Sequence, residues 1–138
     1  LISLRRGKNG ARNITGLLQG SRRFLPTVTP ANITTAGAGT YTASQLNKGI
    51  ITRDPAGANR TDTTDTAANL IAAAGLNLSQ TYVERECLIV NTADAAETIT
   101  LAGGTGVTLK GTITIEQNTA IRIAILRTGA AAVTIRQI

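Results

Sequence analysis

From Thr81 to the end of the chain, apolar and polar residues alternate in short runs, and this pattern limits the possible folds more than any other feature. Alternate residues of a strand lie on one face of a sheet, so each run predicts a strand with one buried face. The whole chain offers about six or seven such strands, separated by short turn sequences. The predicted fold is mainly β, an antiparallel β-sandwich or jelly-roll-like barrel with neighbouring strands paired as hairpins. The inward residues expected after position 98 are Ile99, Leu101, Val107, Leu109, Ile113, Ile115, Ile121, Ile123, Ile125, Val133 and Ile135.

The apolar residues that must fill this core are almost all aliphatic. Hydrophobic residues make up 42% of the 138 positions, but aromatic residues make up only 2%. Phe24, Tyr41 and Tyr82 are the only aromatic residues, and Trp, Met and His are absent. Because large aromatic side chains usually dominate core energetics, we expect a thin core that gains from further burial between subunits. A homo-oligomer is therefore expected.

The segment Gly49–Gly75 reads as a strand, a turn and one short helix. Gly49–Arg53 has the apolar character of a strand, and Asp54–Gly57 has Asp, Pro and Gly where a type I turn favours them. Thr64, Asp65 or Thr66 can cap the following Ala-rich helix, and Gly75 suits the left-handed position after its end. The predicted helix is too short to be stable alone and must pack on the sheet.

The same segment contains a candidate catalytic or metal-binding cluster, formed by Arg53, Asp54, Arg60, Asp62 and Asp65. Carboxylates three residues apart can offer oxygen ligands to calcium, and paired carboxylates can serve glycoside hydrolysis. The spacing matches no EF-hand loop, and no Glu in the segment supplies the bidentate ligand of such a loop. We therefore favour a structural interpretation, with turn and cap residues and Arg–Asp pairs across the corner.

Other chemistry has few residues to support it. The absence of His removes the usual general base and metal ligand, and a single Cys cannot form an intrachain disulfide or a cysteine zinc site. Cys87 lies in an apolar run and is expected to be a buried thiol, with an intermolecular or reactive role as the alternative. Gly103–Gly106 lacks the Lys and Ser/Thr of a phosphate loop and is interpreted as a hairpin turn. We expect a protein that is not an enzyme, has no cofactor or metal, and does not span a membrane.

The net charge of +6 is located entirely in the first 23 residues, which contain six basic residues and no acidic ones. The remaining eight basic and eight acidic residues cancel. We therefore divide the chain into a basic, extended N-terminal arm with its linker, residues 1–30, and a β domain, residues 31–138. Interpretations of the arm include a solvated tail, a phosphate-binding segment with steep salt dependence, and an anchor that lies across a neighbouring protein.

The anchoring interpretation is favoured because small apolar clusters are interleaved with the cations. Such clusters add little to a purely electrostatic tail, and no aromatic residue precedes Phe24 to stack on bases. The residues expected to bind the partner are Arg5, Arg6, Lys8, Arg12, Leu17, Leu18, Arg22, Arg23 and Phe24.

Three segments together resemble the small β-rich virion proteins of tailed phages: YTASQLNKGIITRDPAGANRTDTTDTAANLIAAAG, LIVNTADAAETITLAGGTGVTLKGTITIEQNT and AAAVTIRQI. They share an excess of Thr, Ala and Gly, few aromatic residues, short strands and tight turns. The resemblance covers residues 40–138 and leaves the basic arm outside. It implies a capsid decoration, minor capsid or fibre component, often trimeric, and it carries over no functional residue.

Charge, composition and resemblance combine into one hypothesis. The chain is expected to be a structural virion protein, a capsid decoration or cement protein that trimerises, binds the major capsid protein or another virion protein through its arm, and stabilises the shell. One alternative is a receptor-binding fibre or tail-spike module. Another is an internal virion protein associated with DNA.

Overall fold

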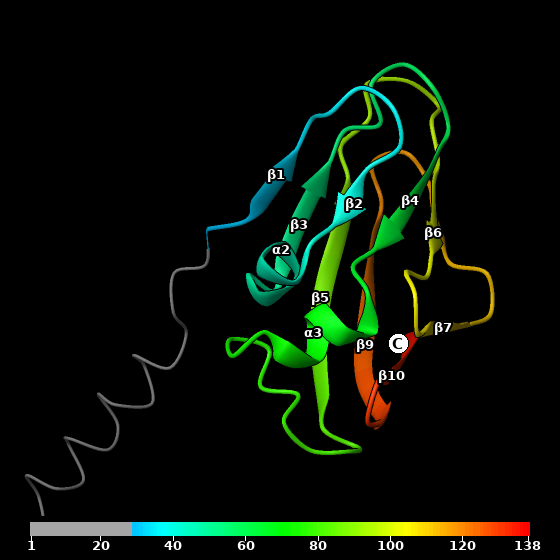
Figure 1. The fold of residues 1–138 in the computed structure, drawn as a ribbon. Coiled ribbons are helices and arrows are strands. Elements are labelled where there is room, and N and C mark those ends of the chain that lie inside the picture. The colour runs from blue at the N-terminus through cyan, green and yellow to red at the C-terminus, as the bar shows by residue number, and fades with distance from the viewer. Residues whose placement is uncertain (1–28) are drawn as a thin grey trace, which may run out of the picture.

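The computed structural model describes residues 29–138, which form two mixed β-sheets and two short helices (Figure 1). The prediction of a mainly β fold is confirmed. The six-stranded sheet has the order β1-β3-β5-β9-β10-β7, and the four-stranded sheet has the order β2-β4-β6-β8. In chain order the elements are β1 (Ala31–Ile33), β2 (Thr40–Tyr41), α2 (Ala43–Asn47), β3 (Ile50–Arg53), β4 (Arg60–Thr64), α3 (Ala67–Ala72), β5 (Glu84–Asn91), β6 (Ile99–Ala102), β7 (Val107–Lys110), β8 (Thr114–Ile115), β9 (Ala120–Gly129) and β10 (Ala132–Gln137).

The chain winds between the two sheets, and each of its first three turns adds one strand to each sheet. In the six-stranded sheet β1, β3 and β5 are neighbours and run parallel. In the four-stranded sheet β2, β4 and β6 are likewise neighbours and parallel. Parallel strands need a crossover connection, and here the strand in the opposite sheet is part of that crossover. The later strands β9 and β10 break this pattern, because β9 runs antiparallel to both β5 and β10.

The prediction of an antiparallel fold built from hairpins is therefore wrong for most strand pairs. Five of the eight pairings are parallel, and only β9 and β10 are both consecutive and paired. The interpretation of Gly103–Gly106 as a hairpin turn is also wrong, since β6 and β7 belong to different sheets. Alternation of apolar residues defines the buried face of a strand, but it does not define the sheet that the next strand joins.

Gly104 shows why the β6–β7 connection needs glycine. A Cβ atom at this position would lie 2.5 Å from the carbonyl oxygens of Thr64 and Asp65. The Gly104 N–H also donates a hydrogen bond to the Thr64 hydroxyl at 3.0 Å. The glycine therefore allows this connection to approach the backbone after β4 closely.

Inward side chains of both sheets form one aliphatic core. In the six-stranded sheet Ile51, Ile89 and Ile121 occupy one row across β3, β5 and β9, and all three are buried. From the four-stranded sheet Ile99 and Ile115, which face each other across β6 and β8, join the same core. Nine of the expected inward residues are buried, which confirms the strand faces, whereas Val107 and Leu109 on the edge strand β7 are half-buried. The nine are Ile99, Leu101, Ile113, Ile115, Ile121, Ile123, Ile125, Val133 and Ile135.

Residues 29–138 contain two short helices, whereas the sequence predicted one. The additional helix, α2, begins after Thr42, whose hydroxyl accepts a hydrogen bond from the Gln45 N–H while the Gln45 side chain accepts one from the Thr42 N–H. This reciprocal capping box is readable in the sequence as Thr-x-x-Gln. The predicted helix is α3, with Thr66 as its N-cap. Leu46 of α2 and Leu70 of α3 are both buried in the core.

Two details of the predicted Gly49–Gly75 segment are wrong. Ala56, the third residue of the Asp-Pro-Ala-Gly turn, has φ of +56°, whereas a type I turn has a negative φ there. Gly75 is not the left-handed end of α3, because the helix ends at Ala72 and its C-cap Ala73 already has extended backbone. Gly75 is instead packed against the Asn47 side chain so closely that a Cβ would collide with it.

Candidate functional site

The predicted polar cluster contains a fully buried ion pair that joins the two sheets. Arg53 lies at the end of β3 in the six-stranded sheet, and Asp62 lies in β4 of the four-stranded sheet. The Arg53 Nε and the Asp62 Oδ2 are 2.7 Å apart, and both side chains are 0% exposed. The phenol of Tyr41, at the end of β2, donates a hydrogen bond to the same carboxylate at 2.9 Å. One charged pair thus ties together strands from the first two turns of the chain.

Every donor and acceptor of this pair is used. The five N–H groups of the Arg53 guanidinium have five acceptors: both Asp62 oxygens and the carbonyl oxygens of Thr35, Gly37 and Asp54. Asp62 accepts two hydrogen bonds from Arg53, one from Tyr41 and one from the Gly39 N–H at 2.6 Å. A guanidinium and a carboxylate each have about this capacity. Neither group therefore has a position left for a substrate or a cation.

The electrostatics agree with a permanently ionised pair. Burial opposes the charge on Asp62, but hydrogen bonds from Arg53, Gly39 and Tyr41 and the nearby guanidinium charge lower the pKa of the carboxyl below its ordinary value. Burial also opposes the charge on Arg53, yet its hydrogen bonds and its attraction to Asp62 raise its pKa. Burial, with the adjacent Asp62 carboxylate, strongly raises the pKa of Tyr41. The phenol therefore remains a donor and cannot act as a base near neutral pH.

The other members of the cluster have local tasks. Asp65 accepts hydrogen bonds from the Ala43 and Thr66 N–H groups and from the Asn69 side chain, and together these lower its pKa despite some burial. Asp54 accepts a hydrogen bond from the Ala56 N–H within the turn. The Arg60 guanidinium donates to the Pro55 carbonyl at 2.9 Å. The expected Arg–Asp pair across the corner is present, and it is fully buried.

Cys87 is a buried thiol, as predicted. It is 1% exposed, and burial raises its pKa to about 12. A nucleophilic or metal-binding cysteine needs a thiolate, which this environment disfavours. Among residues 29–138, no group of three His, Cys, Asp or Glu side chains is placed to hold a metal ion.

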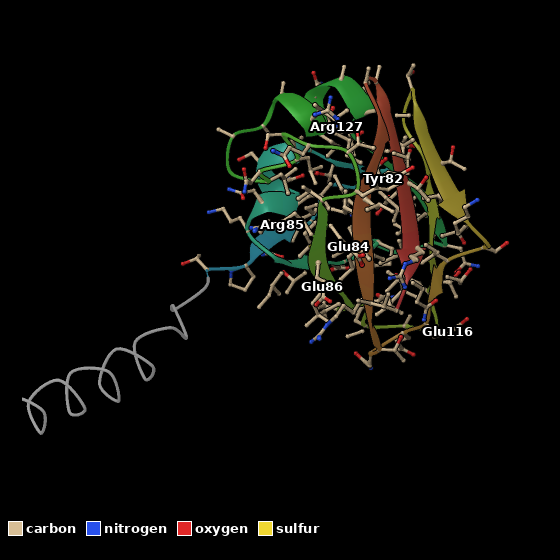
Figure 2. The ribbon with its side chains drawn as sticks, turned by 90° about the horizontal axis from the view of Figure 1, so that it is seen from below. Tyr82, Glu84, Arg85, Glu86, Glu116 and Arg127 are labelled. Carbon is tan, nitrogen blue, oxygen red and sulfur yellow. The ribbon has the colours of Figure 1, made fainter. Side chains whose placement is uncertain are left out.

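Exposed charges on the outward side of the six-stranded sheet are sorted by strand, an arrangement that was not predicted from the sequence. Glu84 and Glu86 lie on β5, whereas Arg122, Arg136 and Lys110 lie on β9, β10 and β7. Figure 2 shows Glu84 and Glu86 along β5, beside β9 and β10. Arg136 reaches Glu84 at 3.0 Å and Arg122 reaches Glu86 at 3.7 Å, but these side chains are 36–58% exposed and the pairs are weak.

An open pocket of about 280 Å³ indents this side of the sheet where β3 meets β5. Ile50 and Leu88, which are partners across the two parallel strands, contribute its apolar part. Glu86 and Arg122 contribute charged groups, and Gly49 and Cys87 complete the lining. Parallel strands are normally covered on both faces, so this half-apolar outward side is unusual. Strand alternation indicates this second apolar patch, because Leu88 and Val90 have the opposite parity to the core residues Cys87 and Ile89.

Tyr82 is the most exposed large hydrophobic residue described, at 77%. It was expected inside a strand, but β5 begins only at Glu84, and Tyr82 has φ of +68°. Its N–H donates to the Arg127 carbonyl at 2.7 Å. The Arg127 guanidinium in turn binds the carbonyl oxygens of Leu78 and Ser79, so hydrogen bonds to β9 hold this loop in place (Figure 2).

The residues predicted to bind a partner all fall in the first 28 positions and lie outside the described part of the chain. Their role therefore stays a prediction. In the part of the chain that the structure covers, no helix combines the length and apolar character needed to span a membrane.

Comparisons with protein-family models, curated proteins and solved structures find no match to this chain.

Proposed function

We propose that this chain is a structural protein of a phage particle, a capsid decoration or cement protein that binds the major capsid protein or another virion protein and stabilises the shell. The observation that carries the proposal is the separation of charge between the two parts of the chain. Residues 29–138 contain eight basic and eight acidic residues, whereas the first 23 positions hold the whole net charge of +6. In this proposal the two sheets form a sandwich, and residues 1–30 are an extended arm.

The buried network supports a scaffold rather than a reaction centre. Arg53 and Asp62 were among the candidate catalytic groups. Their side chains instead form hydrogen bonds with each other that join the two sheets. β1, the strand that follows residues 1–30 in the sequence, is an edge strand of the six-stranded sheet (Figure 1). An arm that leaves from a sheet edge can reach a neighbouring subunit without crossing the core.

Apolar anchors are proposed to contribute more to capsid binding than single cations. Burying one Leu or Phe side chain contributes about 1.5–3 kcal/mol, whereas an exposed ion pair contributes about 0–1 kcal/mol. Leu17, Leu18 and Phe24 are therefore the proposed anchors. The cations steer the arm towards an acidic shell surface. Copies of the chain are proposed to associate on the capsid, as the expected trimer or as another homo-oligomer.

The test is binding to capsids assembled without this chain. We expect deletion of residues 1–25 to abolish saturable binding, and replacement of Leu17, Leu18 and Phe24 by Ser to weaken it more than replacement of Arg5, Arg6 and Lys8 by Gln. Circular dichroism checks that each variant keeps its β fold. Wild-type occupancy by the deletion variant would refute the arm hypothesis. Strong, salt-sensitive binding of duplex DNA without capsid binding would favour the internal alternative.

A further inference from the structure

We infer that the outward side of the six-stranded sheet is a contact between two copies of this chain, related by a two-fold axis parallel to β9. This outward face consists of one set of alternate residues and of the pocket between β3 and β5: Glu84, Glu86 and Leu88 of β5, Ala120, Arg122 and Ala124 of β9, Arg136 of β10 with the following Ile138, and Lys110 of β7. Within residues 29–138 neither helix covers it, because α2 and α3 place Leu46 and Leu70 in the core. Ala124 of β9 is nevertheless 0% exposed, so neighbouring side chains of the same chain cover that position. The inference does not depend on the proposed capsid role or on the arm.

The order of charges across the face selects a second copy as its occupant. Glu86, Ala124, Arg136 and Lys110 form one register row across β5, β9, β10 and β7. Neighbouring strands are about 4.8 Å apart, so acid and base lie on opposite sides of a small central residue. Rotation about an axis along β9 reverses the strand order and keeps the strand direction. It therefore places the acidic strand of one copy over the basic strands of the other.

The other two-fold arrangement of two facing sheets is disfavoured by the same charges. An axis perpendicular to the strands, within the plane between the sheets, would place β5 over β5 and oppose acid with acid. Like charges in an interface are costly and select against wrong arrangements. A two-fold contact uses the same surface on both copies, so one favourable charge pair occurs twice.

Apolar groups of the face are brought together by the same rotation. The Ile138 N–H donates to the Arg122 carbonyl at 2.9 Å, which places Ile138 beside the row that contains Leu88 and Arg122. Ile138 is 45% exposed and Leu88 is partly buried. Rotation about β9 brings Leu88 of one copy over Ile138 of the other. Within one chain Arg122, which lies near the axis, is 3.7 Å from Glu86, and Arg136 is 3.0 Å from Glu84. Both pairs are exposed and weak, so these charges can also interact with the second copy.

Two alanines lie at the centre of the face. Ala120 and Ala124 are the outward residues of β9 on either side of Arg122; Ala120 is exposed, whereas Ala124 is 0% exposed beneath other side chains of its own chain. Sheets pack face to face at about 10 Å with their strands nearly aligned. Ala120 and Ala124 suit that geometry, and the exposed Arg122 between them faces Arg122 of the other copy, where the Glu86 of each chain, 3.7 Å from its own Arg122, offsets the like charge.

The experiment measures the mass of the full-length chain by light scattering and sedimentation over a range of protein concentrations. We expect a dimer in the wild type. Glu86→Lys and Arg136→Glu should each weaken dimerisation by at least tenfold, because each replaces attraction by repulsion at two symmetric places. An equimolar mixture of the two variants should restore a dimer. In the mixed dimer the new lysine of one variant faces the new glutamate of the other at one place, and the original pair of Glu86 and Arg136 is kept at the other place.

Asp94→Lys is the matched control, because it makes the same charge change at an exposed loop position. Lys110→Glu provides a second disruptive variant on an exposed edge strand, with a smaller expected effect. Circular dichroism verifies that each variant is folded. A monomeric wild type, a trimer or other oligomer insensitive to these reversals, or a mixture that fails to recover the dimer would overturn the inference.

Discussion

Replacing Asp62 by Asn should destabilise the domain severely, although the side chain keeps its size. The substitution removes the carboxylate that is paired with a guanidinium that is 0% exposed. It also places an amide NH₂ among donors, since the four hydrogen bonds at Asp62 all come from N–H or O–H groups. Removing one partner of a buried ion pair typically costs about 3–5 kcal/mol. A domain of this size has about 5–15 kcal/mol in total.

The assay is chemical and thermal unfolding of Asp62→Asn beside Asp94→Asn, which changes an exposed loop residue. We expect the buried variant to lose about 3–5 kcal/mol, with a fall in Tm on the order of 15–25 °C. The control should stay within about 0.5 kcal/mol of wild type. A loss below about 1 kcal/mol for Asp62→Asn would refute the reasoning, because it would mean that water or a rearranged partner compensates Arg53.

The pH dependence provides a second measurement on the same residue. The pKa of Asp62 is lower in the folded than in the unfolded chain. In the acid range the folded state therefore binds fewer protons than the unfolded state does, and acid favours unfolding. Its contribution is fully present above the unfolded value of about 3.9 and is lost as pH decreases through the folded pKa. Wild-type stability should therefore fall below about pH 4, and Asp62→Asn should show a flatter acid limb. Equal acid limbs for both proteins would contradict the assigned ionisation.

Three further predictions concern separate features. Gly104→Ala should cost at least about 2 kcal/mol in urea unfolding, because its Cβ would lie 2.5 Å from two backbone carbonyl oxygens; a neutral result would show that the β6–β7 connection can move. Ala56→Gly should raise stability by up to about 1 kcal/mol, because Ala56 has φ of +56°, and a lower Tm would contradict this expectation. Cys87 should react with a thiol reagent only after unfolding, since it is 1% exposed and its pKa is raised to about 12; rapid labelling of the native protein would exclude a buried thiol.

Sequence patterns predicted the buried faces of the later strands but not the course of the chain. Ile121, Ile123 and Ile125 are inward as alternation requires, because one face of a strand must avoid water. Strand direction depends on which sheet each connection reaches, and no local pattern reports that. β4, for example, is Arg-Thr-Asp-Thr-Thr, whose only buried side chains are polar. Without apolar alternation no strand was predicted there, between the expected turn and the expected helix.

The sequence predicted which residues form the polar cluster, but it did not predict that Arg53 and Asp62 are buried. An Arg–Asp pair across the corner was expected, but the pairing of Arg53 with Asp62 in the interior depends on the contact between two different sheets. Charged residues are almost never fully buried unless paired, so sequence alone favours an exposed turn. The sorted charges of β5, β9 and β10 were equally hidden, because strands far apart in the sequence supply them.

The winding of the chain has a consequence for its synthesis. Ile51 pairs with Ile89, and Ile89 pairs with Ile121, so the central contacts of the larger sheet join residues far apart along the chain. Contacts of this kind slow folding. A ribosome that has completed the first three turns has produced β5 with its second edge still bare, since β9 is made only with residues 120–129. Bare apolar edges recruit other chains, and premature termination before β9 should therefore yield aggregates rather than a smaller folded domain.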